Sequence, residues 1–550
     1  MINLQFMYFC QRSNKLPILT ILPDHSFYNF HILYINHIIM KIKLKTIVVP
    51  LALGACMGGA AAEEQEKPNI IIVYLDDLGY GDLSCYGGEV NTPYVDRLAE
   101  NGIRFTNAYA PASTCTPSRY SLLTGRYAFR VGAAIMAGDA PLLISEETST
   151  LPGMLQQNGY KTALIGKWHL GLGDGNIDWN GKITPGPLER GFDYAFMIPA
   201  TGDRVPTVWV ENHHVVGLDP EDPISVSFRG KIGEDPTGTE RPELLRFAAD
   251  NQHAATIVNG VSRIGWMEGG NSARWKDEKM PHEMLKKARQ FINENKENPF
   301  FMYFSFHDIH VPRLPDYRFM GATDLGPYGD VIVQMDWVTG QLVEYLEKLG
   351  LDQNTLIIFS SDNGPVLNDG YEDMSVELVG GGTHNPAGPF RGGKYSAYEA
   401  GNRMPTIAYW PKGIQPGQVS DALIGQIDLY ASLAALVGHS LDEIEAPDSH
   451  NVLDALLGRS DTGRDYLMLE SYTFSIRKGD YKYIRPATNL GPISWIHGTK
   501  NIESGLMQET QLFNLATDIN EQINIAGDRA DLVREMDDII QFIFDNEVTR

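Results

Sequence analysis

Four continuous apolar runs, each ending in polar residues, dominate the hydrophobic pattern of this chain. They are Pro68–Leu75, Tyr160–Ile165, Pro299–Phe306 and Thr355–Phe359. Runs without alternating polar positions are typical of strands buried on both faces of a mostly parallel sheet. Helices are predicted between them, at Thr92–Asn101, Met284–Glu294 and Tyr328–Leu349. The pattern therefore predicts an α/β fold with a large, mostly parallel mixed sheet flanked by helices.

Two segments depart from this alternation. Residues 171–280 are rich in Gly, Pro, Asp, Asn, Trp and His, and we expect an irregular insertion that carries functional loops or covers one sheet face. Near residue 460, short strands are predicted at Asp465–Glu470, Phe474–Arg477 and Tyr481–Ile484, followed by a helix over Arg529–Asn546. We therefore expect a large α/β domain over 66–455 and a small α+β C-terminal domain with an antiparallel sheet over 456–550.

The N-terminal residues have the pattern of a targeting segment. Met40 opens a basic stretch, and Thr46–Ala55 is apolar but too short to span a membrane. We predict that Met40 is the true start, that 1–39 is a non-native upstream extension, and that 40–62 is a signal peptide. Ala60–Ala62 fits signal peptidase cleavage, whereas Leu53–Cys56 resembles a bacterial lipobox that would make Cys56 a lipid anchor. Both outcomes predict export to a periplasm or cell surface.

Composition narrows the class of protein and of partner. The 550 residues are 43% hydrophobic and 21% charged, as in ordinary globular proteins, and the formal net charge of −24 argues against nucleic acid as a partner. Of the four cysteines, only Cys85 and Cys115 lie in the body of the chain. We predict no disulfide between them, because the Cys115 thiol is needed for the chemistry described below.

Polar clusters follow the predicted strands at the point where each one ends. Asp76 and Asp77 follow the first run, and Asp362 and Asn363 follow the last. The carboxyl ends of parallel strands share one edge of the sheet, where ligands bind in open α/β folds. Four oxygen ligands suit a hard divalent cation, Ca²⁺ more than Mg²⁺. The alternative is that these pairs only form turns and helix caps.

A further motif surrounds Cys115, in the run Ser113–Arg126. A proline follows two positions after the cysteine, Arg119 four positions after it, and Leu-Thr-Gly at 123–125. This run resembles the sulfatase signature. Together with Gly166–Gly171, Ser361–Gly364, Phe390–Lys394 and Glu399–Ile407, it makes the chain similar to type I, formylglycine-dependent sulfatases of the alkaline phosphatase superfamily, from about Lys67 to about Ala526.

The resemblance implies a reaction and a set of residues. Cys115 would be oxidised to formylglycine by a formylglycine-generating or anaerobic sulfatase-maturating enzyme, and its hydrate would attack the sulfur of the ester. One Ca²⁺ would be held by Asp76, Asp77, Cys115, Asp362 and Asn363. Arg119 would brace the nucleophile, Lys167 and Lys394 would bind sulfate oxygens, His169 would deprotonate the hydrate, and His310 would protonate the leaving oxygen.

Local structure and specificity residues are also predicted. We expect Ser118–Arg126 to form the first turns of a helix, with Pro117 fitting the first helical turn and the helix N-terminus facing the sulfate. Candidate sugar contacts, with solvated loop residues as the alternative, are Thr201–Pro206, His213, His214, His307, Asp308 and Arg313.

The favoured function is an exported sulfatase that acts on a carbohydrate sulfate ester. Residues 196–224 favour a 6-O-sulfated galactose or N-acetylgalactosamine, although the sequence leaves the sugar and its linkage open. One alternative is a formylglycine-dependent phosphodiesterase or phosphonate monoester hydrolase of the same superfamily. Another is an inactive protein that binds sulfated glycans, against which the complete set of candidate residues argues.

Overall fold

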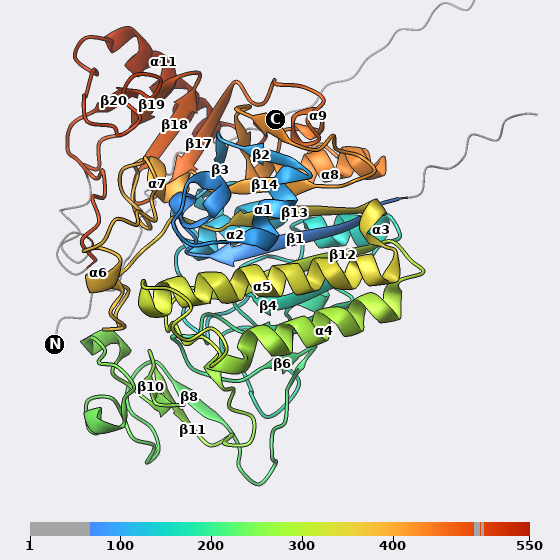
Figure 1. The fold of residues 1–550 in the computed structure, drawn as a ribbon, viewed down its shortest axis with the longest axis vertical. Helices are drawn as coiled ribbons and strands as arrows, with labels where there is room; N and C mark the ends of the chain where they lie inside the picture. Colours follow the sequence, from blue (N-terminus) through green and yellow to red (C-terminus); the bar gives the residue numbers. More distant parts are fainter. Residues whose placement is uncertain (1–66, 489–495, 497–499) are drawn as a thin grey trace, which may run out of the picture. The chain divides into compact units, whose positions relative to one another are not determined.

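A ten-stranded mixed sheet forms the centre of the computed structural model, which describes residues 67–488, 496 and 500–550 (Figure 1). The predicted extension 1–39 and signal peptide 40–62 lie outside the described residues. In spatial order the strands are β15 (Gln418–Ser420), β2 (Ile103–Phe105), β14 (Thr406–Tyr409), β13 (Thr355–Ser361), β1 (Asn69–Asp76), β12 (Phe300–Ile309), β4 (Lys161–Lys167), β5 (Tyr194–Ile198), β6 (Val210–Glu211) and β7 (His214–Val215).

The four predicted apolar runs are the central strands of this sheet. β13, β1, β12 and β4 are neighbours and run parallel, with Ile72 of β1 opposite Tyr303 and Ile358. Every residue of β1 and β12 is buried, which explains why neither sequence alternates with polar residues. The predicted α/β class is therefore confirmed, and the carboxyl ends of the four strands meet at one edge.

Helices cover both faces of the sheet. One face packs against α1 (Pro93–Glu100), α4 (Met280–Asn295) and α5 (Gly326–Leu349), of which α4 and α5 lie side by side in Figure 1. The other face packs against α2 (Cys115–Thr124), α3 (Leu151–Gln157), α8 (Leu429–Val437) and α9 (Leu453–Leu456). In the described part of the chain, no helix combines the length and apolar character needed to cross a membrane.

The expectation of an irregular insertion over 171–280 is wrong for part of that segment. Its five-residue run Tyr194–Ile198 is β5, which pairs in parallel with β4. This strand was missed because a short run between glycine-rich and proline-rich stretches gives a weak periodic signal. β6 and β7 of the same segment extend the sheet beyond β5. The later part of the segment forms the green lobe at the bottom of Figure 1, with the short strands β8 (Ser225–Ser227), β9 (Ile257–Val258), β10 (Val261–Ser262) and β11 (Trp266–Glu268).

A separate antiparallel sheet is present in the C-terminal region, as predicted. It consists of β17 (Tyr466–Glu470), β18 (Phe474–Lys478), β19 (Tyr481–Ile484) and β20 (Gln511–Asn514), with α11 (Ala530–Asp545) packed on it. Among the two-stranded sheets, one pairs β3 (Ala108–Tyr109) with β16 (Ile424–Gly425). The helices α6 (Ser375–Leu378) and α7 (Glu399–Asn402) are single turns.

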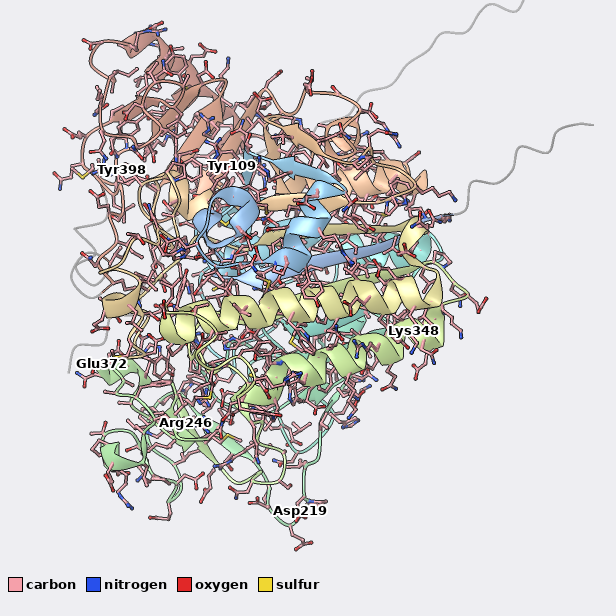
Figure 2. All side chains as sticks on the ribbon, in the orientation of Figure 1. Tyr109, Asp219, Arg246, Lys348, Glu372 and Tyr398 are labelled. Carbon is pink, nitrogen blue, oxygen red and sulfur yellow. The ribbon has the colours of Figure 1, made fainter. Side chains whose placement is uncertain are left out.

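A buried ionic network joins the C-terminal sheet to the catalytic part of the chain. Glu399 of α7 lies 3.0 Å from Lys482 Nζ of β19 and accepts a hydrogen bond from the Tyr109 hydroxyl at 2.6 Å. Tyr109, labelled in Figure 2, in turn accepts a hydrogen bond from Arg477 of β18. Lys482 Nζ also lies 3.4 Å from Glu521, and all three side chains are fully buried, so no charge in this network is hydrated and each depends on its neighbours.

Replacing Glu399 by Gln should lower the free energy of unfolding by about 3–5 kcal/mol, because Lys482 and Arg403 both lose their nearest buried carboxylate. Urea unfolding followed by fluorescence would measure the change. The control is Arg97→Ala, which breaks an ion pair with Glu347 whose two side chains are 41% and 40% exposed. That change should cost at most about 1 kcal/mol, and equal losses in the two variants would contradict the assignment.

Candidate active site

The polar residues predicted at the strand ends come together at one edge of the central sheet. Asp76 is the last residue of β1, Lys167 is the last of β4, and Asp362 directly follows β13. One carboxylate oxygen each of Asp76 and Asp362 and the Cys115 sulfur all lie within 4.8 Å of one another. The four parallel strands and helix α2 therefore build one site.

Helix α2 begins at Cys115, three residues earlier than the predicted Ser118, and ends at Thr124 rather than Arg126. Thr114 is still extended, with φ −148° and ψ 151°, and Pro117 is tolerated because it lies in the first turn. Cys115 thus stands at the positive end of the helix, where an anion is favoured. Burial nevertheless raises the pKa of the Cys115 thiol, although Lys167 and Lys394 oppose this effect. Cys85 and Cys115 are both free among the described residues.

Arg119 lies one turn along α2 and is fully buried among polar partners. Its Nε donates to Asp362 Oδ2 at 2.9 Å, and its Nη2 lies 2.7 Å from the same oxygen. Nη1 donates to the Ser305 hydroxyl on β12. Arg119 thus fixes Asp362 relative to α2 and β12. Burial alone would raise the pKa of Asp362, but Arg119, Lys167 and Lys394 hold it below the usual range.

Lys167 lies within the same buried group of charges. Its Nζ donates to Asp76 Oδ2 at 2.6 Å and lies 4.0 Å from Asp362 Oδ2. A Cβ on the preceding residue, Gly166, would stand 1.9 Å from the Ser305 carbonyl oxygen, so only glycine allows β4 to approach β12 this closely.

The carboxylates and the amide of this edge form an oxygen-rich site. Asp76 Oδ1 and Asn363 Oδ1 are buried and accept no hydrogen bond from the described residues, while Asn363 Nδ2 donates to Asp77 Oδ1 at 2.7 Å. Burial and neighbouring carboxylates raise the pKa of both Asp76 and Asp77. A hard divalent cation would satisfy the two orphaned oxygens and favour the ionised carboxylates. The donor set therefore fits such a metal ion.

Lys394 pairs with an aspartate, Asp369, that the sequence pattern did not predict as part of the site. Its Nζ donates to Asp77 Oδ2 at 2.9 Å and to Asp369 Oδ2 at 3.0 Å. Asp369 follows no predicted strand and belongs to no motif, so only the fold reveals it. Burial alone would raise the pKa of Asp369, but Lys394 and Lys500 hold it well below its usual range.

The two candidate histidines are buried, and each presents one bare ring nitrogen. His310 Nδ1 donates to the Val311 carbonyl at 2.7 Å, which leaves Nε2 facing Asp77 Oδ2 at 3.8 Å. His169 Nε2 donates to the Met136 carbonyl at 3.0 Å, which leaves Nδ1 unprotonated when the ring is neutral. Burial, with Lys167 and other nearby cations, lowers the pKa of both rings well below the usual value, so both are neutral bases at pH 7.

A pocket of about 570 Å³ opens onto this group of residues. Cys115, His310 and Lys394 line it, together with Asp369. Of the described catalytic candidates, Arg119, Lys167 and His169 lie outside the lining. The structure therefore divides the predicted residues into a set exposed to the pocket and a set that supports it.

The predicted sugar contacts are divided in the same way. Asp203 and Arg204, from the predicted run Thr201–Pro206, line the pocket. His213 instead pairs with Glu189 at 2.8 Å, and His214 is exposed on β7. Their positions do not support a contact with substrate.

Three further candidates near β12 are buried away from the pocket lining. Arg313 pairs with Asp373 at 2.8 Å, and Asp308 accepts a hydrogen bond from Gln334 of α5. Neither ring nitrogen of His307 has a hydrogen-bond partner among the described residues, and burial, followed by the Lys167 charge, lowers its pKa to about 3. The strand-end position that suggested these residues does not by itself decide which face a side chain takes.

Comparison with known proteins gives consistent results. The family model described as Sulfatase matches residues 68–439. The chain is 49% identical to an N-acetylgalactosamine-6-O-sulfatase of Bacteroides thetaiotaomicron over 88% of this chain and 94% of that protein. It is 33% identical to human arylsulfatase A over 78% of this chain and 77% of the relative. A solved structure from a study of glycosaminoglycan metabolism by B. thetaiotaomicron superposes with a TM-score of 0.85 and 48% identity, covering 88% of this chain and all of the other.

Replacing Arg119 by Met should lower the free energy of unfolding by about 3–5 kcal/mol, because Asp362 loses its closest buried cation. Urea unfolding in the presence of a chelator would measure the change. Arg126→Met, just beyond the end of the same helix, serves as the control, because its side chain is only partly buried. Equal stability of the two variants would contradict the role assigned to Arg119.

Proposed function

This chain belongs to the sulfatase family of sulfuric ester hydrolases and is a carbohydrate sulfatase; on that premise we propose that it releases the 6-O-sulfate of an N-acetylgalactosamine or galactose residue. The observation that carries the proposal is the 49% identity with an N-acetylgalactosamine-6-O-sulfatase over nearly the whole length of that protein. The identity of the sugar is inferred from this relative, whereas the type of reaction is inferred from the geometry of the site.

The nucleophile of the proposed reaction derives from Cys115. Members of this family generally use formylglycine and a metal ion, and we propose that Cys115 is converted by a formylglycine-generating or anaerobic sulfatase-maturating enzyme. Cys115 is 2% exposed at the first position of α2, so conversion has to precede folding of this segment. The mass of the peptide covering residues 105–130 distinguishes a thiol from an aldehyde.

The charged residues of the site then have distinct proposed roles. Lys394 lines the pocket and donates to sulfate oxygens, where it compensates the charge that develops as the ester bond breaks. The bare Nδ1 of His169 accepts the proton of the nucleophile. His310 Nε2 is bare in the neutral ring, so it takes up a proton once the anionic sulfate ester is bound and then passes that proton to the leaving sugar oxygen. Arg119 and Lys167 hold Asp362 and Asp76 in place.

We further propose that the metal ion is Ca²⁺. The available ligands are Asp76, Asp77, Asp362, Asn363 and residue 115, a set dominated by carboxylate and amide oxygens. When bound, such a cation polarises an ester oxygen and favours the ionised nucleophile.

Export is also part of the proposal. The basic and apolar stretches of 40–62 support a signal peptide, with processing after Ala62 or lipidation of Cys56 as the two outcomes. Both place the enzyme in a periplasm or at a cell surface, where sulfated saccharides are accessible.

Among defined substrates, the mature enzyme should release inorganic sulfate from 6-O-sulfated N-acetylgalactosamine faster than it cleaves an aryl phosphodiester. Lys394→Ala should lower kcat/KM by about 100-fold or more, because a charged donor to the transition state is lost. Lys348→Ala, an exposed lysine at the end of α5 that is labelled in Figure 2, should leave the rate unchanged. Preference for the phosphodiester would instead favour the alternative activity of the superfamily.

Adding Ca²⁺ to protein stripped with a chelator should raise its Tm, because a ligand at 100 times its Kd stabilises the folded state by about 2.7 kcal/mol. Equal concentrations of Mg²⁺ should raise it less. Asp76→Ala should remove the Ca²⁺ response, whereas Asp219→Ala, at an exposed loop labelled in Figure 2, should retain it. A Ca²⁺ response that survives Asp76→Ala would place the ion elsewhere.

A further inference from the structure

One wall of the pocket is built by charged residues from two distant parts of the chain. Asp203 and Arg204 follow β5, while Asp250 and His253 come from the insertion lobe, and all four line the pocket. The four side chains are two carboxylates, one guanidinium and one imidazole. The residues are mostly buried, with side-chain exposures of 5% for Asp203, 12% for Arg204 and 4% for His253.

Asp203 is held from two sides. Its Oδ1 accepts hydrogen bonds from Arg204 Nη1, at 2.8 Å, and from the Thr201 hydroxyl. Its Oδ2 faces His253 Nε2 at 3.4 Å, a long contact that leaves this oxygen able to accept another hydrogen. Burial alone would raise the pKa of Asp203, but Arg204 and His253 hold it well below its usual range, so it stays an acceptor.

Arg204 retains unused donors. Its Nη1 serves Asp203 and Thr201, whereas Nε and Nη2 donate to no residue that the structure describes. A planar guanidinium carries five N–H groups, so most of its donors remain available to a ligand in the pocket.

His253 holds this wall in place. Its Nδ1 contacts Asp250 Oδ1 at 2.7 Å while Nε2 points to Asp203, so the ring bridges two carboxylates. Burial lowers the pKa of His253, but the hydrogen bonds to Asp203 and Asp250 outweigh it and raise the pKa, which favours the ring with both nitrogens protonated. A Cβ at Gly370 would stand 2.1 Å from Nδ1, so the ring packs directly on the backbone next to Asp369.

We propose that Asp203 and Arg204 form the subsite that binds two neighbouring hydroxyl groups of the sulfated sugar, and that His253 is the positioning residue of this subsite. The proposal rests on the carbohydrate sulfatase function. The carboxylate accepts a hydrogen bond from one hydroxyl, and the guanidinium donates to the oxygen of the other. A carboxylate paired with a guanidinium suits a neutral diol, whereas a second sulfate or a carboxylate would be repelled by Asp203 and Asp250.

The test compares two sulfate esters. One is 6-O-sulfated N-acetylgalactosamine, and the other is 4-nitrophenyl sulfate, which carries no hydroxyl groups. Asp203→Asn and, separately, Arg204→Gln should lower kcat/KM for the saccharide at least about 10-fold more than for the aryl sulfate, as expected for loss of a hydrogen bond to a charged group. The excess should appear mainly in KM, because the hydroxyls take no part in bond cleavage.

Arg246→Ala is the matched control, since Arg246 lies in the same lobe (Figure 2) and pairs with Glu278 outside the pocket lining. It should leave both rates unchanged. Equal losses on the two esters in Asp203→Asn and Arg204→Gln, or no loss on either, would overturn the subsite. Thermal unfolding of each variant identifies any loss due to misfolding, and the two variants are independent of each other.

Double mutants test the role of His253. His253→Gln should lower saccharide kcat/KM about 10-fold in the native background and have little further effect in Asp203→Asn, because it acts through that carboxylate. The same loss in both backgrounds would overturn the positioning role.

The outcome also separates this inference from the proposed substrate. If the native enzyme hydrolyses the aryl sulfate but not this saccharide, the proposed sugar is wrong, and the same ratio is measured on whichever sulfated saccharide it does hydrolyse. If the native enzyme hydrolyses no sulfated saccharide at all, the proposed hydroxyl-binding subsite is wrong as well.

Discussion

Three carboxylates crowd one buried edge of the central sheet, and this concentration of negative charge constrains everything around it. Asp76, Asp77 and Asp362 lie too close together and too far from water to remain ionised alone. Each is matched by a cation from a different element: Lys167 ends β4, Arg119 lies on α2, and Lys394 lies in the loop before α7. Stability and chemistry therefore have the same origin here, because the groups that neutralise the edge are also those around the nucleophile position.

Much of this arrangement could be predicted because it follows from strand ends. A fully buried parallel strand leaves a long apolar run in the sequence, and the first polar residue after it stands at the ligand-binding edge. Asp76, Asp362 and His310 could be predicted at this edge for that reason. Cys115 was predicted through its motif, and Pro117 was correctly expected in the first turn of the helix, which begins at Cys115.

The remaining residues of the pocket could not be predicted, for a physical reason. Asp369 and the pair of Asp250 and His253 lie on irregular loops, where no periodic pattern fixes which way a side chain points. Their roles depend on contacts between distant segments, such as the packing of His253 on Gly370. Conversely, Asp308 lies near the end of β12 and Arg313 soon after it, yet both contact buried partners outside the pocket lining. Position along the chain thus locates the edge of the sheet and the part of the wall formed by Asp203 and Arg204, but not the part formed by Asp250 and His253.

The pocket thus has two parts. Its floor is formed by residues at the ends of the central strands and at the start of α2, and its wall is formed by loops of the segment between β5 and α4. Insertions and deletions are tolerated in such loops far better than in the strands of a buried sheet. Over evolutionary time, the wall is free to diverge by changes in length as well as in residue, while the floor changes only with the folding of the whole core. Related chains would then share one reaction but differ in the saccharides they accept. Their sequences would differ most in the lobe between β5 and α4.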